Sequence, residues 1–416
     1  MKKIIMSAVA LTAIMGPVST LSAADDGINI LNDVKLTGQI RPRYEYVDAQ
    51  GDKDAANAYT ARTHLKIKAG LLNIDGLTTT IGVQSVNNFG SNGYNSTDNG
   101  QTDYNVIKDP NFAMLSEASI DYKIGKTALH AGRSQVNLDN QRFIGTVGWR
   151  QVERSYDTVY AANSDVENLD ILVAYVYGLQ GVGAAPTTDA SSILLHAKYK
   201  LMDELSITAY DYMLAIGVQG IDSDTYGLAL TGKIDVGAKL NYRAEYAMQS
   251  DASMSYRSAD KGTADATYMN FDLGANISGV LLGANYEVLS GKDGDKTTFN
   301  PALGTNHKFN GWADMFYVAN KPEGGLQDLN VRAGYKTKDF GKLLAVYHAF
   351  TADTEMPGVD GSTDDLGSEI DAVYVHKIPG VNNLTGLVKA AYYMGGEATG
   401  YTNDKAVGWA QLDYKF

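Results

Sequence analysis

The last eleven residues of the chain, 406–416, alternate between apolar and polar side chains. One face carries Ala410, Leu412, Tyr414 and Phe416, and the other carries Gln411, Asp413 and Lys415. A period of two indicates a β-strand. An apolar-faced strand at the end of a chain would be an exposed edge, whereas in a closed barrel the last strand pairs with the first. The ending therefore favours a β-barrel.

The opposite end of the chain has the organisation of a secretory signal peptide at 1–24. Lys2 and Lys3 precede an apolar segment at 4–15, and small residues at 22–24 provide a cleavage site. The apolar segment is too short to cross a bilayer. We therefore expect an exported protein whose single domain, 25–416, can span a membrane only with strands.

Composition agrees with a barrel and excludes several other classes. Without Lys2 and Lys3 the chain has 33 basic and 48 acidic residues, a net charge of −15, which disfavours nucleic-acid binding. No Cys is present, so disulfides and thiolate metal sites are excluded. A mean hydropathy of −0.21 is uninformative, because strands that alternate apolar and polar residues average to a neutral value.

The same alternation recurs along the chain. In the clearest segment, 34–47, Leu36 and Ile40 oppose Arg41 and Arg43. Further copies lie at 59–71, 169–178, 192–201, 239–249 and 329–337. One face suits lipid and the other suits water, so we predict an all-β, transmembrane antiparallel β-barrel.

The connections between these segments alternate in length, as they do in outer-membrane barrels. Short turns are expected at 73–76, 125–126, 202–203, 235–237, 278–279 and 339–341. Long loops are expected at 48–58, 88–113, 136–154, 179–191, 215–224, 250–265, 290–328, 351–367 and 395–405. Both ends should lie on the periplasmic side, which requires an even number of strands. Treating 313–319 as loop leaves 18 strands; 16 is the alternative if short segments such as 155–162 are misassigned.

Two of the long loops, 136–154 and 290–328, are rich in Trp, Phe and Ile. Such side chains need a surface to pack on, so we predict that both loops fold into or over the lumen and narrow it. The alternative is that they pack on each other outside the mouth. Residues 88–105 and 358–367 have the composition of plain solvated loops.

Several of these stretches resemble a known family. The runs GRSQ at 132–135, LDNQRFIG at 138–145, GWRQ at 148–151 and GTNHKFNGWAD at 304–314 are similar to the alginate-export family of outer-membrane porins. The resemblance covers most of the mature chain and implies an eighteen-stranded, monomeric barrel with a solute pore. In the best-known member the pore is rich in Arg and passes an anionic polysaccharide. The matching positions here are Arg133, Arg142 and Arg150.

The C-terminal strand also resembles the assembly signal of bacterial outer-membrane proteins. The resemblance assigns this role to Tyr414 and the terminal Phe416. The expected partners are therefore periplasmic chaperones, the barrel assembly machinery, and lipid and lipopolysaccharide in the outer membrane of a Gram-negative bacterium.

Strand alternation adds further residues to the expected pore lining. Arg41, Arg43, Arg62 and Lys66 are basic residues on water-facing positions, and Glu45 and Glu245 are acidic ones. Opposed rings of charge set the ion preference of a pore. The alternative is that these charges pair with one another as ordinary salt bridges.

From these features we predict that the protein is an outer-membrane porin, a channel for passive diffusion of small hydrophilic or charged solutes. One alternative is a dedicated exporter or importer of an anionic polysaccharide or oligosaccharide. A second is a barrel enzyme or an adhesive structural barrel. The six His have no metal-ligand spacing and no Gly-x-Ser-x-Gly elbow occurs, so we expect no enzyme activity, no metal and no cofactor.

Overall fold

The computed structural model describes residues 30–217, 221–250, 266–292, 294, 297–317 and 321–416. This part of the chain forms one sheet of eighteen strands. The first nine are β1 (Leu31–Ala49), β2 (Ala56–Leu71), β3 (Leu77–Asn87), β4 (Phe112–Ile124), β5 (Thr127–Ser134), β6 (Ser155–Asn163), β7 (Leu169–Gln180), β8 (Thr188–Met202) and β9 (Leu205–Ile216). The other nine are β10 (Ile221–Asp235), β11 (Lys239–Ser250), β12 (Ala266–Ile277), β13 (Val280–Leu289), β14 (Leu326–Thr337), β15 (Gly341–Gly358), β16 (Gly361–Lys377), β17 (Leu384–Met394) and β18 (Lys405–Lys415). One short 3-10 helix, η2 (Asn306–Lys308), lies between β13 and β14.

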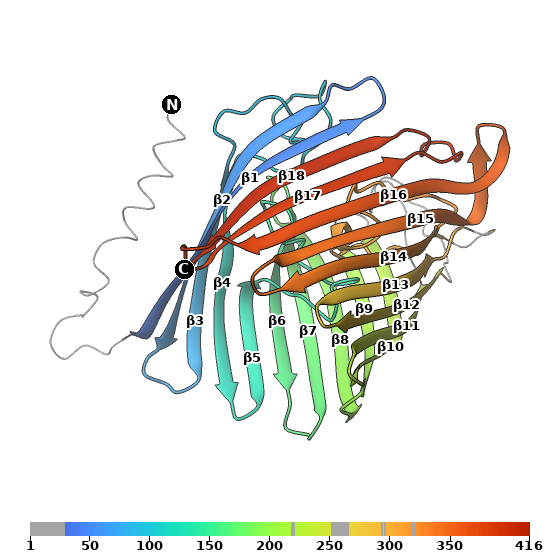
Figure 1. Ribbon diagram of the computed structural model, residues 1–416. Helices are drawn as coiled ribbons and strands as arrows, with labels where there is room; N and C mark the ends of the chain where they lie inside the picture. The colour runs from blue at the N-terminus through green and yellow to red at the C-terminus, as the bar shows by residue number, and fades with distance from the viewer. Residues whose placement is uncertain (1–29, 218–220, 251–265, 293, 295–296, 318–320) are drawn as a thin grey trace.

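The sheet closes on itself as an antiparallel barrel. Each strand pairs with its neighbours in sequence, and β18 pairs with β1, with Lys415 opposite Gln39 and Lys405 opposite Ala49. Figure 1 shows the C-terminus beside the first strands of the chain. The predicted eighteen-stranded barrel is confirmed. Residues 155–162 belong to β6, so the sixteen-stranded alternative is wrong.

The two faces of the sheet differ as the alternation predicts. On β1, Leu36 and Ile40 are 44% and 42% exposed, whereas Arg41 and Glu45 on the other face are 5% and 1% exposed. Large apolar side chains are likewise exposed along the other strands. The barrel therefore presents apolar side chains outward and places charged side chains such as Arg41 and Glu45 inside, which suits a surrounding membrane.

The terminal residue completes the closure. The Phe416 N–H donates to the Gly38 carbonyl oxygen at 3.0 Å, and the Gly38 N–H donates to the Phe416 carbonyl oxygen at 2.8 Å. A Cβ atom on Gly38 would lie only 2.4 Å from the Phe416 ring. Glycine at position 38 therefore leaves the space that the terminal aromatic ring occupies on the outer face.

Four expected long loops are shorter than the sequence suggests, and the one expected at 179–191 covers only 181–187. β15 and β16 continue to Gly358 and from Gly361, so most of 351–367 is strand rather than loop. Similarly, β9 reaches Ile216 and β10 begins at Ile221, and the connection expected at 48–58 covers only 50–55. The ends of β15 and β16 carry polar residues on both faces, as at 353–355 and 362–365. They therefore lack the alternation that reveals a strand in the sequence.

The long connection between β13 and β14 is confirmed, since β13 ends at Leu289 and β14 begins at Leu326. Residues 313–317 are not strand, and 318–319 lie outside the described residues. The predicted signal peptide at 1–24 and almost all of the loop expected at 250–265 also lie outside them. In the described ranges, no helix is long and apolar enough to cross a membrane.

Candidate functional site: a constriction inside the barrel

Two long loops fold into the barrel: the first inner loop, 135–154, and the second inner loop, the described residues of 290–325. The Phe143 ring of the first lies 5.4 Å from the Tyr210 ring on β9 and 5.1 Å from the Tyr268 ring on β12. Phe299 of the second lies 5.8 Å from Phe143. Tyr268 and Phe299 are fully buried. The prediction of inward folding is confirmed, because the aromatic side chains pack on the inner wall.

The two inner loops are joined through their backbones. The Gly145 N–H donates to the Leu303 carbonyl oxygen, and the Thr305 N–H donates to the Gln141 carbonyl oxygen, both at 2.9 Å. Arg154 Nη1 donates to the Leu303 carbonyl oxygen at 2.5 Å. The loops therefore form one unit, which we call the constriction.

Arg142 fastens the constriction to β13. Its Nε and Nη2 atoms lie 2.9 Å from the two carboxylate oxygens of Glu287, and Nη2 also donates to Asn310 Oδ1 at 2.9 Å. The Arg142 side chain is 1% exposed. Tyr268 donates its hydroxyl hydrogen to the same carboxylate at 2.8 Å. The guanidinium group is therefore enclosed by packed side chains and has almost no contact with water in the lumen.

Arg41 fastens the first inner loop to β1. It donates through Nε to Gln151 Oε1 at 3.0 Å, through Nη1 to the Gly148 carbonyl oxygen at 2.9 Å, and through Nη2 to the Arg150 carbonyl oxygen at 2.5 Å. Gln151 also donates to Thr60 Oγ1 on β2 at 3.0 Å. These contacts satisfy loop carbonyl groups that would otherwise be buried without a donor.

Arg43 and Arg62, like Arg41, bind the first inner loop to the wall. Arg43 Nη2 donates to the Trp149 carbonyl oxygen at 2.5 Å, and its guanidinium lies 4.2 Å from the Trp149 ring centroid. Arg62 forms an ion pair with Glu153. Both arginines are 3% exposed. Like Arg41, they contribute to holding the constriction as well as to the charge of the wall.

A third loop, between β3 and β4, also forms hydrogen bonds with the constriction. The Gln151 N–H donates to Asp109 Oδ1 at 2.9 Å, and Tyr94 donates its hydroxyl hydrogen to the Asp109 carbonyl oxygen at 2.9 Å. Tyr94 and Asp109 are fully buried. The expectation that 88–105 is a plain solvated loop is therefore wrong, because Tyr94 packs inside the barrel.

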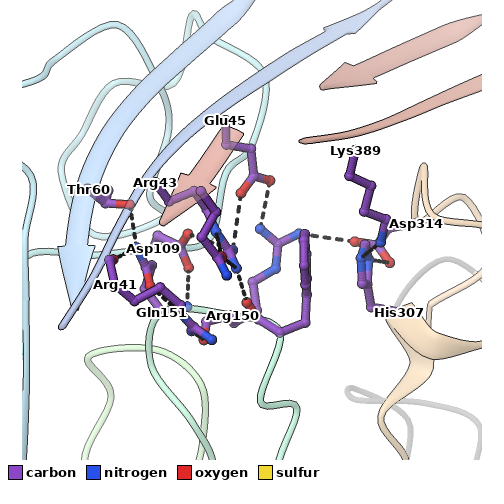
Figure 2. Close-up of polar contacts among 12 residues, drawn as sticks. Arg41, Arg43, Glu45, Thr60, Asp109, Arg150, Gln151, His307, Asp314 and Lys389 are labelled. Carbon is purple, nitrogen blue, oxygen red and sulfur yellow. Dashed lines mark hydrogen bonds and ion pairs between the residues drawn. The ribbon is translucent and has the colours of Figure 1, made fainter. Parts of the chain in front are cut away.

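A chain of charges crosses from β1 to the second inner loop. Arg150 Nη1 donates to Glu45 at 2.9 Å and Nη2 donates to Asp314 at 3.0 Å, as Figure 2 shows. Burial alone would raise the pKa of the Asp314 carboxyl, but His307 and Arg150 hold this pKa well below its usual range. Asp314 is therefore ionised and links the two inner loops electrostatically.

His307 connects Asp314 to the wall. Its Nδ1 atom lies 2.8 Å from Asp314 Oδ1, and its Nε2 atom lies 2.6 Å from Lys389 Nζ on β17 (Figure 2). Burial lowers the pKa of His307 to about 4. The ring is therefore neutral at neutral pH, with Nδ1–H donating to the carboxylate and Nε2 accepting from the ammonium group.

Lys66 is the basic residue of the expected pore lining with the most access to solvent. Its side chain is 36% exposed, and Nζ lies 2.8 Å from Glu117 Oε1. It lines a cavity of about 470 Å³ together with Arg41, Arg62, His64 and Glu153. Glu245, in contrast, is buried and accepts hydrogen bonds from Arg243 and Tyr210 at 2.7 and 2.9 Å.

Arg133 lies on the other face of the sheet. His130, Gly132 and Ser134 alternate on the inner face of β5, which turns Arg133 outward with the exposed Leu129. Its Nε and Nη2 atoms bind the Asp157 carboxylate at 2.6 and 2.8 Å. Arg133 therefore does not belong to the pore lining.

Several residues of the constriction were not among the expected site residues. They are Gln151, Glu153 and Asp314 of the inner loops, together with Asp109 and Lys389, which hold these loops. The aromatic content of the two inner loops was the signal for inward packing. The sequence gives no comparable signal for the wall residues that contact each loop. Which residues these are depends on which strands face the loop in space.

One interior cluster has the order of contacts found in a serine hydrolase. Ser134 Oγ lies 3.2 Å from His130 Nε2, and His130 Nδ1 lies 2.7 Å from Asp121 Oδ1. However, His130 Nε2 also lies 3.3 Å from the Gly132 carbonyl oxygen, which can only accept a hydrogen bond. Nε2 therefore has two oxygen neighbours, and Ser134 Oγ is not its sole partner. The cluster therefore favours a structural role.

Comparison with known proteins supports the class of fold. No family model matches the chain, and no curated protein sequence matches it. The chain is similar to solved structures from Pseudomonas aeruginosa. OpdO has 13% identity, covering 93% of this chain and 98% of that one, with a TM-score of 0.71. OccK1 (OpdK) has 12% identity, covering 93% and 99%, with a TM-score of 0.71.

A third similar structure, OpdQ of the same organism, has 14% identity, covers 92% of this chain and 98% of its own, and has a TM-score of 0.68. These neighbours are OccK/OprD outer-membrane porins. Identity this low shows a shared fold, the closed eighteen-stranded barrel. The comparisons do not support the narrower resemblance to the alginate-export family.

Proposed function

We propose that the protein is a porin of the Gram-negative outer membrane, through which small hydrophilic or charged solutes diffuse passively. The observation that carries the proposal is the closed barrel, apolar outside and charged inside, with two loops packed within it. A barrel of this size would leave a wide aqueous lumen unless loops narrowed it. The inner loops thus make it a selective pore.

The interior charges are distributed unevenly around the wall. Basic residues Arg41, Arg43, Arg62 and Lys66 lie on β1 and β2, with the acidic Glu45 among them. Acidic residues Glu245, Glu287, Asp328 and Glu369 lie on β11, β13, β14 and β16, with the basic Arg243 beside Glu245. Opposed charges of this kind orient solutes and set ion preference. Lys66, beside its cavity, is the basic residue we assign to solute contact.

The constriction favours small solutes over a polymer. The first inner loop is held by Arg41 of β1 and, through its own Arg142, by Glu287 of β13, so it runs between two separated parts of the wall. No contact in the described residues favours the alternative of an anionic polysaccharide. The resemblance to the alginate-export family rests on the sequence motifs alone.

The remaining parts of the proposal concern export and assembly. The segment 1–24 would direct export and be removed, leaving 25–416 in the outer membrane as a monomer. The barrel assembly machinery and periplasmic chaperones would recognise the Tyr414 and Phe416 ending. Lipid and lipopolysaccharide would contact the apolar outer face. No cofactor or metal is part of the proposal.

The first experiment is single-channel recording of the purified protein in planar bilayers, with the reversal potential measured under a salt gradient. We expect discrete conductance steps with a defined ion preference, because charged side chains line an interior narrowed by loops. Preparations that insert fully folded but never conduct would contradict the proposal. They would favour a closed adhesive barrel.

Removing the Lys66 charge should change ion selectivity. The Lys66→Gln variant is expected to lower anion preference, because the Glu117 carboxylate, 2.8 Å from Nζ, would lose its partner and leave net negative charge in the lumen. The matched control is Arg133→Gln, which removes a positive charge from the outer face. Equal shifts of reversal potential in the two variants would show that Lys66 lies off the solute path.

A further inference from the structure

The three tryptophans of the chain gather around one ammonium group. Lys389 Nζ lies 4.2 Å from the Trp149 ring centroid, 4.0 Å from that of Trp312 and 4.9 Å from that of Trp409. These distances are within the range of cation–π attraction, which is strongest for Trp and for a desolvated cation. Lys389 is 6% exposed.

The members of this cage come from four separate elements. Trp149 belongs to the first inner loop, Trp312 to the second inner loop, and Trp409 to β18, while Lys389 projects from β17. Trp149 also stacks on His307 with centroids 4.8 Å apart and the planes at 9°. A single side chain of the wall therefore contacts both inner loops at once.

A lysine at this position needs compensation for its burial, because an isolated ammonium group is costly to remove from water. Its one hydrogen-bond acceptor within the described residues is His307 Nε2, at 2.6 Å. The faces of Trp149 and Trp312 add to the attraction from the nearby carboxylates of the wall and loop, and they can do so only while both inner loops stay in place. The ammonium group and the loop positions therefore depend on each other.

We propose that Lys389 is the positioning residue of the constriction: its ammonium group, held by Trp149, Trp312, Trp409 and His307, fixes both inner loops against the wall and so sets the pore dimensions. This inference rests on the proposed porin function. Removing the ammonium group lets the two inner loops move relative to β17. The solute path through the pore then becomes wider, and its width fluctuates.

The test combines conductance with tryptophan fluorescence, since all three tryptophans report on the cage. In the Lys389→Met variant we expect emission at longer wavelength, larger single-channel conductance and greater open-channel noise than in the native protein. In Lys389→Ala, added n-propylammonium replaces the missing side-chain atoms and should restore native emission and conductance. n-Propanol, similar in size but uncharged, should not. The Lys377→Met variant, on an exposed site outside the cage, serves as the matched control.

Native emission and native conductance in Lys389→Met would overturn the inference, as would equal rescue by propanol and propylammonium. Heat-modifiable gel mobility confirms that each variant has a folded barrel before it is measured. A native protein that does not conduct would overturn the porin function instead. The fluorescence and rescue experiments would then decide the role of Lys389 by themselves.

Discussion

Replacing Arg142 with Met is expected to destabilise the constriction by about 3–5 kcal/mol, the usual cost of breaking one side of a buried ion pair. Arg142 fills the space between the first inner loop and β13, and its loss leaves the Glu287 carboxylate buried with Asn310 and Tyr268 as hydrogen-bond donors but without its ion-pair partner. Hydrogen exchange of amides in 135–154 should accelerate accordingly. Single-channel conductance should rise as the loop leaves the wall.

The matched control for Arg142 is a variant that removes both charges. Arg142→Met combined with Glu287→Leu should be less destabilised than Arg142→Met alone, because no carboxylate is left unpaired. The barrel strands should keep native exchange rates in both variants. Native exchange in 135–154 after Arg142→Met would mean that the loop is held by its other contacts.

Deleting Phe416 is expected to slow barrel assembly and to lower the amount of folded protein in the outer membrane. The deletion removes two backbone hydrogen bonds to Gly38, which together stabilise the closure by about 1–3 kcal/mol. It also removes the aromatic ring that lies against Gly38. Pulse labelling followed by heat-modifiable gel mobility measures the rate at which folded barrel appears.

Two further variants separate the ring of Phe416 from its backbone. Phe416→Ala keeps both hydrogen bonds and loses the ring, whereas Gly38→Ala keeps the ring but places a Cβ atom where the ring lies. If recognition of the aromatic ending controls assembly, Phe416→Ala should behave like the deletion. Native assembly of the deletion variant would count against an assembly signal at this end of the chain.

The barrel was predictable because its physical cause is local. A strand with lipid on one side and water on the other must alternate, and Leu36 and Ile40 oppose Arg41 and Arg43 in the sequence as in the structure. Where the alternation is missing, as in the strand ends within 351–367, the sequence predicts a loop although the chain forms a strand. The two inner loops were predictable as well, because Phe143, Trp149 and Trp312 cannot remain solvated at low cost.

The site was predictable only in part. Arg41, Arg43 and Lys66 face the interior because strand alternation places them there. Arg133 was assigned from a motif, although the alternation of β5 itself groups it with Leu129 on the outer face. No sequence pattern distinguishes Lys389, since a single lysine in an apolar strand is uninformative without its spatial neighbours.

The sequence by itself determined the class of this protein: an all-β chain with an apolar and a polar strand face, and two aromatic loops that need a surface. These properties depend on side-chain periodicity and composition, which are readable one segment at a time. Only the tertiary structure decided which charges are free and which are used for packing. Arg142 meets Glu287, 145 positions away, and Lys389 meets Trp149 and Trp312, because barrel closure brings distant strands and loops together. Contacts between such distant residues are set by the closed sheet, and no local pattern encodes them.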